Sequence, residues 1–584
     1  MLPALLLILG LCIGSSNVGA APVSRDDPES ADPGRAVIST ATGKAVVVTA
    51  NPLASQAAMA ALNAGGSAVD ALVSAQAVLA VVEPQSSGLA GGGFLLHWDA
   101  GERTLEVLDG REIAPLSSRP DDLLSPTGQP LPWREATSRL ESVGVPGTVA
   151  LLWDAHQQHG RLPWANALQA AIRLARDGFR PSPRLRRSIT IAQRIGVSHS
   201  AAFQALYLPG GHPPPADKLF RNPALASTLE RLAREGGASF YRGALAQQIL
   251  AGINALRAEQ PGFRRWRPAD LEDYTVVRRP PLCHRLLSYR LCTVPPPSSG
   301  GLAVLQTLAL LNQSRAFSGP TDPNTWRQLA RAQAWADADR LYWVHDPVDG
   351  AIPTGPLLDP AYIKARAAAM QASPATLPTP GLPTGLATYP YALPDQSREQ
   401  GTTHLTIVDV QGNIAAYTSS VETVFGSRHL VAGMVLNNQL TDFAFRPSIN
   451  GQPVANRRRP GRRPVSSMAP LIVFERGQPM LSVGSPGGRS IPHILSRVLL
   501  ASLVWREPPE KAVGLPHLSR RSNGLVVEEE PPLPWPVAIN QLTSGDQPLL
   551  RQRLGSGTAL LQRINGRWHG AADPRREGTA LATD

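Results

Sequence analysis

The sequence predicts a mixed α/β protein with one large packed core. Of its 584 residues, 43% are hydrophobic and 17% are charged, which excludes global disorder, collagen and coiled coil. Helical and strand patterns alternate along the chain, and the character changes near residue 400, where strands become more frequent. With 51 Gly and 56 Pro the chain is loop-rich, unlike a helical bundle. At about 100–200 residues per domain, this length allows three domains or one large two-layer enzyme core.

The first elements are expected before residue 110. A buried strand over 46–48 precedes a helix over 54–64 that stops at Gly65-Gly66. Ser67 and Asp70 have the spacing of a capping box, which predicts a second helix reaching about Val82. A glycine-rich segment over 88–93 then leads into paired strands at 94–98 and 105–108, with Arg111 at the exit.

Helical periodicity dominates the middle of the chain. The expected helices are 148–159, 164–177, 224–234, 244–257, 301–311 and 325–343. The segment 371–400 is rich in Pro and has little apolar periodicity, so we interpret it as an exposed linker.

After the linker the pattern becomes that of a sheet. Residues 405–410 and 414–418 flank the turn Gln411-Gly412-Asn413 and predict a β-hairpin. Further strands are expected at 434–437, 471–474 and 480–483, and a helix at 491–505.

The charge is strongly basic but does not indicate a nucleic-acid partner. The net charge is +11, and all but four of the 56 basic residues are Arg. A basic protein can bind nucleic acid, but these arginines are dispersed along the chain. The one local cluster, Arg457–Arg459 with Arg462 and Arg463, is interpreted as a solvated loop. We therefore expect no nucleic-acid binding.

The N-terminus resembles an export signal. Leu2–Ile13 is apolar and is followed by small residues ending Val18-Gly19-Ala20. The run is too short to span a bilayer of about 30 Å. We expect a signal peptide over 1–20, a polar leader over 21–35, a periplasmic or secreted mature protein, and no stable membrane insertion.

Cysteine and histidine spacing gives little support for a metal site. The three cysteines are Cys12, Cys283 and Cys292, and no CxxC or HExxH motif occurs. We expect no metal. Cys283 and Cys292 flank a short hairpin-like segment; in an oxidising compartment they can pair, and two free thiols remain an equal alternative.

Thr402 has the setting of an N-terminal nucleophile. The Pro-rich linker ends at Gln400-Gly401 and continues directly into Thr402-Thr403-His404 at the start of a strand. Cleavage after Gly401 would give Thr402 a free α-amine beside its own hydroxyl, and this amine can act as the general base. A Thr-rich strand start without catalytic meaning is the alternative.

Motifs in order along the chain resemble the γ-glutamyltranspeptidase family. They are NPLASQAAMAALNAGGSAVDALVSAQAVLAVVEPQSSGLAGGGF, DGREIAP (109–115), GVPGTV (144–149), PPPSSGG (295–301), TTHLTIVD (402–409), LNNQLTDF (436–443), RPVSSM (463–468), GSPGGR (484–489) and GAADPRR (570–576). The resemblance implies an N-terminal nucleophile hydrolase fold, a four-layer αββα sandwich. It also implies self-processing into a large subunit, 21–401 including the linker 371–401, and a small catalytic subunit, 402–584, which together form a heterodimer.

The resemblance assigns the catalytic roles. Thr402 matches the nucleophile, and Ser420 stands where the family has a second Thr that hydrogen-bonds it. Gly487 and Gly488 match the glycines whose N–H groups form the oxyanion hole; one such donor contributes about 3–4 kcal/mol in comparable sites. His404 is interpreted as structural.

The resemblance also assigns the substrate-binding residues. Arg111 matches the arginine that binds the substrate α-carboxylate, for which a guanidinium fork is suited. Ser466 and Ser467 would add hydroxyl donors to the same carboxylate.

A second group would hold the substrate α-ammonium. It contains Asp442 and Gln439, and an acidic group suits a cation because an unpaired buried charge is unfavourable. Glu422 stands where many members have Asn, and it adds a negative charge. The segment between Asp442 and Ser466 is shorter than in members with a lid loop and contains no Tyr, which implies a more open site.

The implied function is that of a γ-glutamyltransferase and glutathione hydrolase. Its substrates would be glutathione and other γ-glutamyl compounds, with water or an amine or peptide as acceptor, and no cofactor is needed. One alternative is a glutaryl acylase acting on cephalosporin-type amides. Retention of Asp442 argues against it, because a glutaryl group has no α-ammonium to pair with this carboxylate. The other alternative is an uncleaved, inactive relative that only binds γ-glutamyl compounds.

Overall fold

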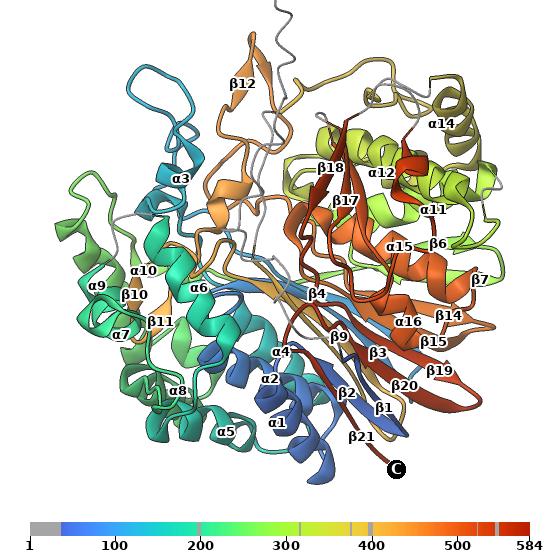
Figure 1. Ribbon diagram of the computed structural model, residues 1–584. Helices are drawn as coiled ribbons and strands as arrows, with labels where there is room; N and C mark the ends of the chain where they lie inside the picture. Colours follow the sequence, from blue (N-terminus) through green and yellow to red (C-terminus); the bar gives the residue numbers. More distant parts are fainter. Residues whose placement is uncertain are drawn as a thin grey trace, which may run out of the picture.

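The protein is built from two large β-sheets stacked face to face between two layers of helices (Figure 1). The computed structural model describes residues 37–195, 200–314, 317–373, 377–394, 401–521, 524–543 and 548–584. The expected signal peptide and polar leader lie outside these residues, as do parts of the Pro-rich linker. Among the described helices, none combines the length and apolar character needed to cross a membrane.

The first sheet is antiparallel throughout and carries the hairpin that follows Thr402. Its seven strands lie in the order β21-β2-β8-β9-β3-β4-β5. Their bounds are β21 Thr579–Thr583, β2 Ala45–Thr49, β8 Thr403–Val408, β9 Ile414–Ser420, β3 Gly92–Asp99, β4 Thr104–Gly110 and β5 Val277–Arg279. The expected hairpin and the expected β3–β4 pair are confirmed.

The second sheet is also antiparallel and combines both ends of the chain. Its order is β1-β20-β19-β15-β14-β7-β6. The strands are β1 Ser39–Gly43, β20 Arg567–Ala572, β19 Ala559–Ile564, β15 Gln478–Gly484, β14 Leu471–Glu475, β7 Tyr289–Thr293 and β6 Leu282–Leu286. Consecutive strands β1 and β2 therefore enter different sheets.

Strands near the centre of the sandwich are apolar on both faces because each face is covered. In β2, Val47 packs in one hydrophobic cluster with the helices, while Val46 and Val48 pack in the other cluster with the second sheet. Successive side chains of a strand point to opposite faces, so two-sided burial produces the continuous apolar sequence of β2. The core thus has two parts, one on each side of the first sheet.

Helices of the N-terminal half cover the first sheet. α1 (Pro52–Asn63) and α2 (Ala68–Val82) contact β2, β8 and β9, and α4 (Thr148–His159) contacts β3 and β4. Ser67 caps α2 by accepting from the N–H of Asp70, whose carboxylate accepts from Ser67, so the predicted capping box is present. The other members of this side are α3 Trp133–Ala136, α5 Trp164–Asp177, α6 Pro183–Arg194, α7 Ala201–Tyr207, α8 Pro223–Glu235, α9 Ala244–Ala255 and α10 Pro268–Glu272.

The second sheet is covered by the remaining helices. They are α11 Gly300–Ser314, α12 Pro323–Trp343, α13 Thr354–Leu357, α14 Pro360–Ala372, α15 Ile491–Leu503 and α16 Pro509–Gly514. A small sheet of β16 (Leu518–Arg521), β17 (Gly524–Glu528) and β18 (Leu549–Gln552) lies beside α12. Two short hairpins complete the described elements: β10 Leu430–Val431 with β11 Met434–Val435, and β12 Ser448–Ile449 with β13 Gln452–Pro453.

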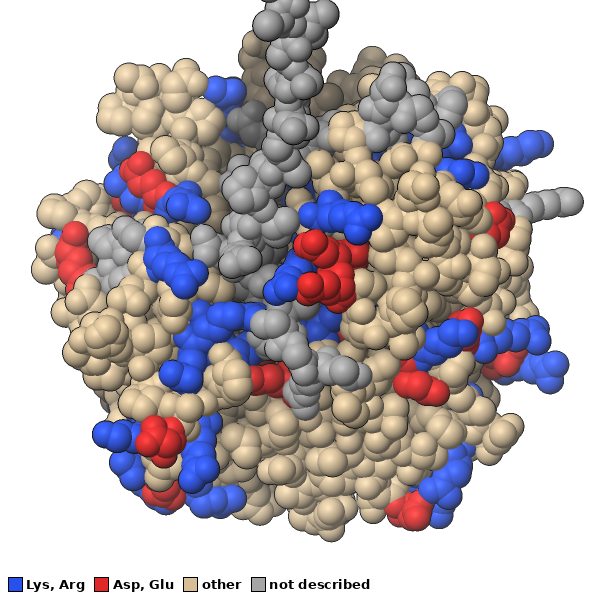
Figure 2. All heavy atoms as spheres, in the orientation of Figure 1, with Lys and Arg blue, Asp and Glu red and all other residues tan. Residues whose placement is uncertain are grey.

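The expectation that the arginine cluster is a solvated loop needs correction. The arginine cluster 457–463 is not simply solvated: Arg458 and Arg463 are buried, with ion pairs to Asp122 and Asp109. Arg459 and Arg462 both pair with Asp349. The acidic partners lie far away in sequence, so the cluster alone gave no sign of them. Elsewhere on the face in Figure 2, basic side chains form separate groups, several of them beside acidic residues.

The Pro-rich segment is exposed but anchored. α14 extends to Ala372, so the segment starts as helix. Most side chains over 377–394 are exposed, yet Trp343 of α12 donates to the carbonyl of Gly381 at 3.0 Å. Tyr342 donates to the carbonyl of Tyr391 at 2.8 Å. These hydrogen bonds hold the segment against α12.

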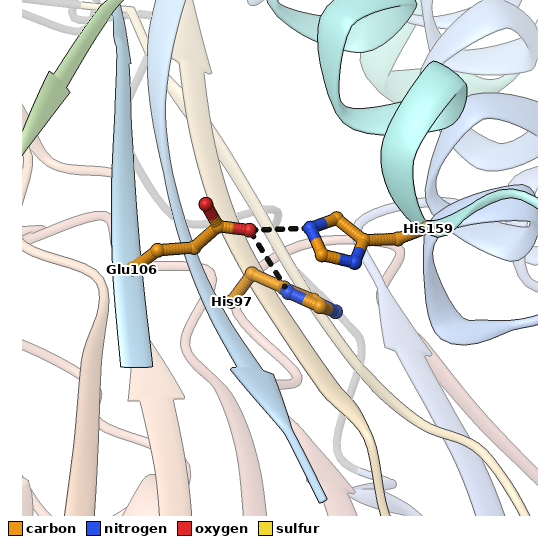
Figure 3. A group of neighbouring side chains, drawn as sticks. All are labelled: His97, Glu106 and His159. Atoms are coloured by element: carbon orange, nitrogen blue, oxygen red, sulfur yellow. Dashed lines mark hydrogen bonds and ion pairs between the residues drawn. The ribbon is translucent and has the colours of Figure 1, made fainter. Parts of the chain in front are cut away.

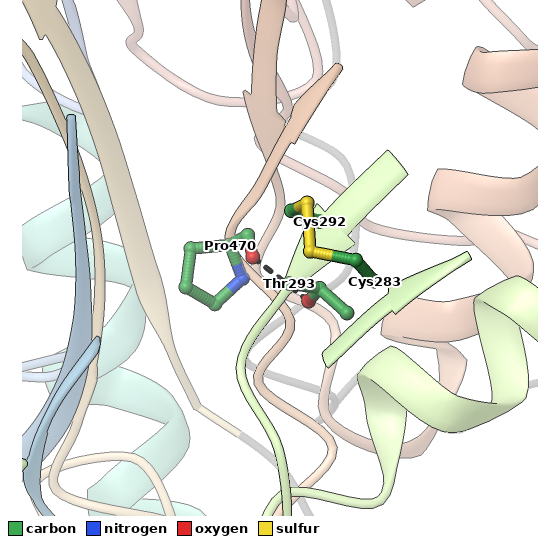
Figure 4. The surroundings of a disulfide bond; sticks show 4 residues. All are labelled: Cys283, Cys292, Thr293 and Pro470. Atoms are coloured by element: carbon green, nitrogen blue, oxygen red, sulfur yellow. Dashed lines mark hydrogen bonds between the residues drawn. A yellow bond between two sulfur atoms is a disulfide. The ribbon is translucent and has the colours of Figure 1, made fainter. Parts of the chain in front are cut away.

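Cys283 and Cys292 form a disulfide (Figure 4). They are directly opposite each other on β6 and β7, so the hairpin register brings them together. The neighbouring Thr293 hydroxyl donates to the carbonyl of Pro470 at 2.9 Å, which ties the hairpin to the segment before β14. Of the two alternatives left by the sequence, the structure has the paired one.

Candidate active site

The expected catalytic residues meet at one end of the two stacked sheets. In the antiparallel first sheet, the start of β8, the end of β9 and the end of β4 lie at the same end of the strands, which we call the catalytic edge. Thr402 directly precedes β8, Ser420 ends β9, and Arg111 follows β4. Strand topology alone therefore gathers residues that are up to 309 positions apart.

The second sheet presents its loops to the same edge. Ser466 and Ser467 precede β14, and Gly484 at the end of β15 is followed by the Gly487-Gly488 turn. Gly484 lies directly against the ring of His404 on β8, so closely that a Cβ at this position would collide with it. This contact joins the strand of the expected nucleophile to the strand that leads into the expected oxyanion turn.

Thr402 is buried and held through its backbone. Thr402 is 3% exposed, and its carbonyl accepts a 2.6 Å hydrogen bond from Nη1 of Arg576. A Cβ at Gly557 would lie 2.6 Å from Cδ of Arg576 and 2.9 Å from Cγ of Pro486. Arg576 thus contacts Thr402, and it borders Gly557 together with Pro486, the residue before Gly487. The sequence placed Arg576 in a family motif but assigned it no role.

The bond before Thr402 has an unusual geometry. Gly401 has φ +77°, in the left-handed region, and a Cβ there would collide with the carbonyl oxygen of Glu422. The hydroxyl of Ser420 donates to the Gly401 carbonyl at 2.5 Å and accepts from the N–H of Glu422 at 2.8 Å. Ser420 therefore contacts the carbonyl that would be attacked if the chain were cut between Gly401 and Thr402.

Gly487 and Gly488 both adopt positive φ, at +134° and +51°. They form the turn between β15 and the short 3-10 helix Gly488–Ser490, which continues into α15. N–H groups at a helix start have no intrahelical partner and carry the positive end of the helix dipole. This is the backbone arrangement expected of an oxyanion hole.

Four of the expected substrate-binding residues form a buried charged cluster. Nη2 of Arg111 lies 2.5 Å from Oδ2 of Asp442, and Nε2 of Gln439 donates to the same oxygen at 2.7 Å. Gln439 also donates to Oε2 of Glu422 at 3.2 Å. Arg111 further donates to the backbone carbonyl of Val465 at 2.7 Å, next to Ser466. The cluster thus combines one guanidinium with two carboxylates.

Glu422 connects this cluster to the cleavage junction. Its N–H contacts Ser420 and its carboxylate contacts Gln439. Its φ is +81°, a conformation that Asn adopts more readily than Glu. The family's Asn therefore suits the backbone here, and Glu retains that conformation while adding a charge.

Ser467 is held by a residue that sequence reasoning missed. Arg340 of α12 is fully buried, and its Nη1 donates to Ser467 at 2.6 Å and to Ser299 at 3.1 Å. Its Nη2 donates to the carbonyl of Arg489, directly after the glycine turn, at 3.2 Å. Ser466 accepts from the N–H of Met468 at 3.1 Å. In the sequence, nothing distinguishes Arg340 from the many other arginines. Its role becomes visible only through its tertiary contacts.

Two buried titratable groups have strongly shifted pKa values. Burial raises the pKa of Glu112, which neighbours Arg111, to about 8, although Arg111 opposes the shift. Burial lowers the pKa of His404 to about 3. His404 Nδ1 lies 2.8 Å from the Thr418 hydroxyl inside the sandwich. A neutral, enclosed His404 agrees with its interpretation as a structural residue.

A four-layer αββα sandwich with a Thr directly before a central strand defines the class of N-terminal nucleophile hydrolases. A sequence model of the gamma-glutamyltranspeptidase family matches residues 54–583, and the chain belongs to this family.

Individual relatives include both hydrolases and acylases. The chain is 30% identical to the glutathione hydrolase proenzyme of Bacillus subtilis strain 168, covering 99% of this chain and 97% of the relative. It is also 30% identical to the acylase ACY 1 proenzyme of Pseudomonas sp. strain V22, covering 93% of this chain and 94% of the relative. The solved cephalosporin acylase from Bacillus halodurans superposes with a TM-score of 0.80 at 25% identity, over 95% of this chain and 98% of that one.

Proposed function

We propose that this chain is a γ-glutamyltransferase and glutathione hydrolase that first cuts itself before Thr402. In the cut, the Thr402 hydroxyl attacks the Gly401 carbonyl carbon, and the peptide C–N bond breaks as the amide nitrogen takes up a proton. Water then hydrolyses the resulting ester. The products are a large subunit ending at Gly401 and a small subunit starting at Thr402, which stay together as a heterodimer.

The new α-amine of Thr402 would then serve turnover. It accepts the proton of the Thr402 hydroxyl as the oxygen attacks the γ-carbonyl of the donor. The oxyanion is stabilised by N–H groups of the Gly487-Gly488 turn. The leaving amine departs with a proton, and water or an acceptor amine then attacks the acyl-enzyme to release glutamate or a new γ-glutamyl compound. Each step is completed by groups of the chain and the two substrates.

The observation that carries the substrate class is the contact between Arg111 and Asp442. An α-amino acid head carries one carboxylate and one ammonium, and these two buried residues offer the complementary charges side by side. On binding, Arg111 and the serines would face the carboxylate, while Asp442, Gln439 and Glu422 would face the ammonium. The 2.5 Å ion pair would then be exchanged for pairs with the substrate, so no charge is left buried alone.

A glutaryl acylase is the second candidate, favoured by the relatives that are named acylases. A glutaryl group has the carboxylate but no ammonium, so Asp442 and Glu422 would face a methylene group. Comparison of γ-glutamyl-p-nitroanilide with glutaryl-p-nitroanilide separates the two. We expect higher kcat/KM for the γ-glutamyl compound; a preference for the glutaryl compound would contradict the proposal.

Self-cleavage is tested by intact mass spectrometry with N-terminal sequencing of the small fragment. Wild-type protein should give a fragment starting at Thr402, and Thr402→Ala should stay a single, inactive chain. Folded wild-type protein that remains uncut would favour the inactive binding relative. Thr403→Ala is the matched control, because it alters the adjacent Thr and should still be processed.

We also propose export from the cytoplasm, on the apolar segment Leu2–Ile13 and the small residues that follow it. Mass spectrometry of the mature large subunit should show a start near residue 21. A mature chain that retains Met1 would contradict this proposal.

A further inference from the structure

Far from the catalytic edge, two histidines and a glutamate converge from three elements (Figure 3). His97 of β3 and Glu106 of β4 are directly opposite each other in the sheet register. His159 is the last residue of α4, which packs over these strands. Their candidate ligand atoms all lie within 4.8 Å of one another.

We propose that His97, Glu106 and His159 form a binding site for a divalent transition-metal ion, with Zn²⁺ as the best match. Two imidazoles and one carboxylate are a ligand set that zinc accepts, with a water in the fourth position. Ligands 2.0–2.1 Å from a tetrahedral ion lie about 3.3 Å apart. Oε1 of Glu106 is 3.4 Å from Nδ1 of His97, close to this spacing.

The second distance requires only a small movement. Nε2 of His159 lies 2.5 Å from the same glutamate oxygen, so an ion would separate these atoms by about 0.8 Å. His159 ends a helix and its side chain is 20% exposed, which gives it room to move. Glu106 is 27% exposed, so water and ions reach the group from the surface.

Two further features favour a metal over a simple hydrogen-bonded group. His97 is 2% exposed, and its Nδ1 contacts only Oε1 of Glu106 among the described residues, at 3.4 Å, which is long for a hydrogen bond. A buried polar atom with so weak a contact is poorly satisfied, and a metal ion would satisfy it. The imidazole rings of His97 and His159 also lie close together, with centroids 4.1 Å apart, so both rings can reach one ion.

The carboxylate is oriented from outside the group. Arg278 of β5 pairs with the other oxygen of Glu106 and with Asp154 at 2.7 Å. This leaves Oε1 directed at the two histidines. Groups that orient metal ligands in this way are common around protein-bound metals.

The ion would act as a clamp between α4 and the first sheet. Glu106 is five residues before Arg111 on an extended strand, about 17 Å at 3.4 Å per residue. At that distance the ion does not touch substrate. We therefore expect it to stabilise the fold while leaving kcat and KM unchanged. The sequence alone did not indicate this group, because its three residues share no local motif.

The test uses tag-free processed enzyme freed of metal with EDTA. Titration calorimetry with Zn²⁺ should give one ion per chain, and Zn²⁺ should raise Tm, since a ligand of the native state stabilises it. Co²⁺ should give the visible absorption of a tetrahedral site. Mg²⁺ and Ca²⁺, which require oxygen ligands, should give neither effect.

Substitutions of the proposed ligands test where the ion binds. His159→Gln and Glu106→Gln should each weaken Zn²⁺ binding at least tenfold and abolish the rise in Tm, whereas exposed His212→Gln should behave as wild type. Equal binding in His159→Gln and wild type would place the ion elsewhere. Absence of Zn²⁺ binding in wild type would leave a hydrogen-bonded cluster only. Either result overturns the proposal.

Discussion

The hydroxyl of Ser420 donates a 2.5 Å hydrogen bond to the carbonyl oxygen of Gly401, the residue before Thr402. Ser420 is thus placed to polarise the bond that self-cleavage would break. A donor aimed at developing negative charge is worth about 10²–10³ in rate. We expect Ser420→Ala to slow processing by this factor, measured by intact mass over time.

Ser420→Thr supplies the control for this prediction. It keeps the hydroxyl and introduces the residue that the family has at this position, so it should be processed at nearly the wild-type rate. If Ser420→Ala and Ser420→Thr are processed equally fast, the hydrogen bond has no role in cleavage.

Gly401→Ala should also slow processing, for a steric reason. Gly401 has φ +77°, and a Cβ would meet the backbone of Glu422. A non-glycine residue in this region costs about 1–3 kcal/mol, which corresponds to about ten- to hundredfold in rate. Gly451→Ala is the matched control, because Gly451 has φ +79° but open space around its Cβ position. Normal processing of Gly401→Ala would show that the bond is cut from another conformation.

Asp442→Asn should reduce kcat/KM for γ-glutamyl-p-nitroanilide about ten- to hundredfold, because a hydrogen bond to a charged group contributes about 1.5–3 kcal/mol. Turnover of glutaryl-p-nitroanilide, which lacks the ammonium, should fall much less. Equal losses on the two substrates would remove the reason for assigning Asp442 to the ammonium.

Arg340→Lys should lower kcat/KM with little change in Tm. Lysine keeps the charge but cannot contact Ser467, Ser299 and the Arg489 carbonyl together as the guanidinium does. Because Arg340 holds both Ser467 and the carbonyl that follows the glycine turn, we expect a higher KM and a lower kcat. Arg327→Lys on the same helix should resemble wild type, because the Arg327 guanidinium makes an exposed hydrogen bond to the Gln541 carbonyl at 2.9 Å. Unchanged kcat and KM in Arg340→Lys would show that Arg340 contributes only to packing.

Glu112 should make stability depend on pH. Burial raises its pKa from 4.5 to about 8, so the folded state binds this proton more tightly than the unfolded state. The stabilisation is complete below about pH 4.5 and is lost as pH rises through 8. The Glu112→Gln variant keeps a neutral side chain at every pH, so the Tm of wild type should fall relative to that of the variant as pH rises from 5 to 8. A difference that is constant over this range would show that Glu112 does not titrate there.

Local sequence patterns correctly predicted the elements whose hydrogen bonds join residues close together in the sequence. The capping box at Ser67, the β8–β9 hairpin and the bounds of α4 and α5 match closely. Their signals lie within a few residues: a cap, a turn, or an apolar period. The strand expected over 434–437 proved to be only Met434–Val435, because its register depends on β10 and not on its own composition.

The order of the elements, the candidate nucleophile at Thr402 and, through family motifs, the residues proposed to bind substrate could all be predicted from the sequence. The pairing of strands, such as β20 with β1 and β21 with β2, became known from the three-dimensional structure. So did the contacts of Arg340 and Arg576 and the convergence of His97, Glu106 and His159. The physical reason is the sequence separation: these contacts join residues of different elements, and no local pattern specifies a partner that only long-range packing brings near.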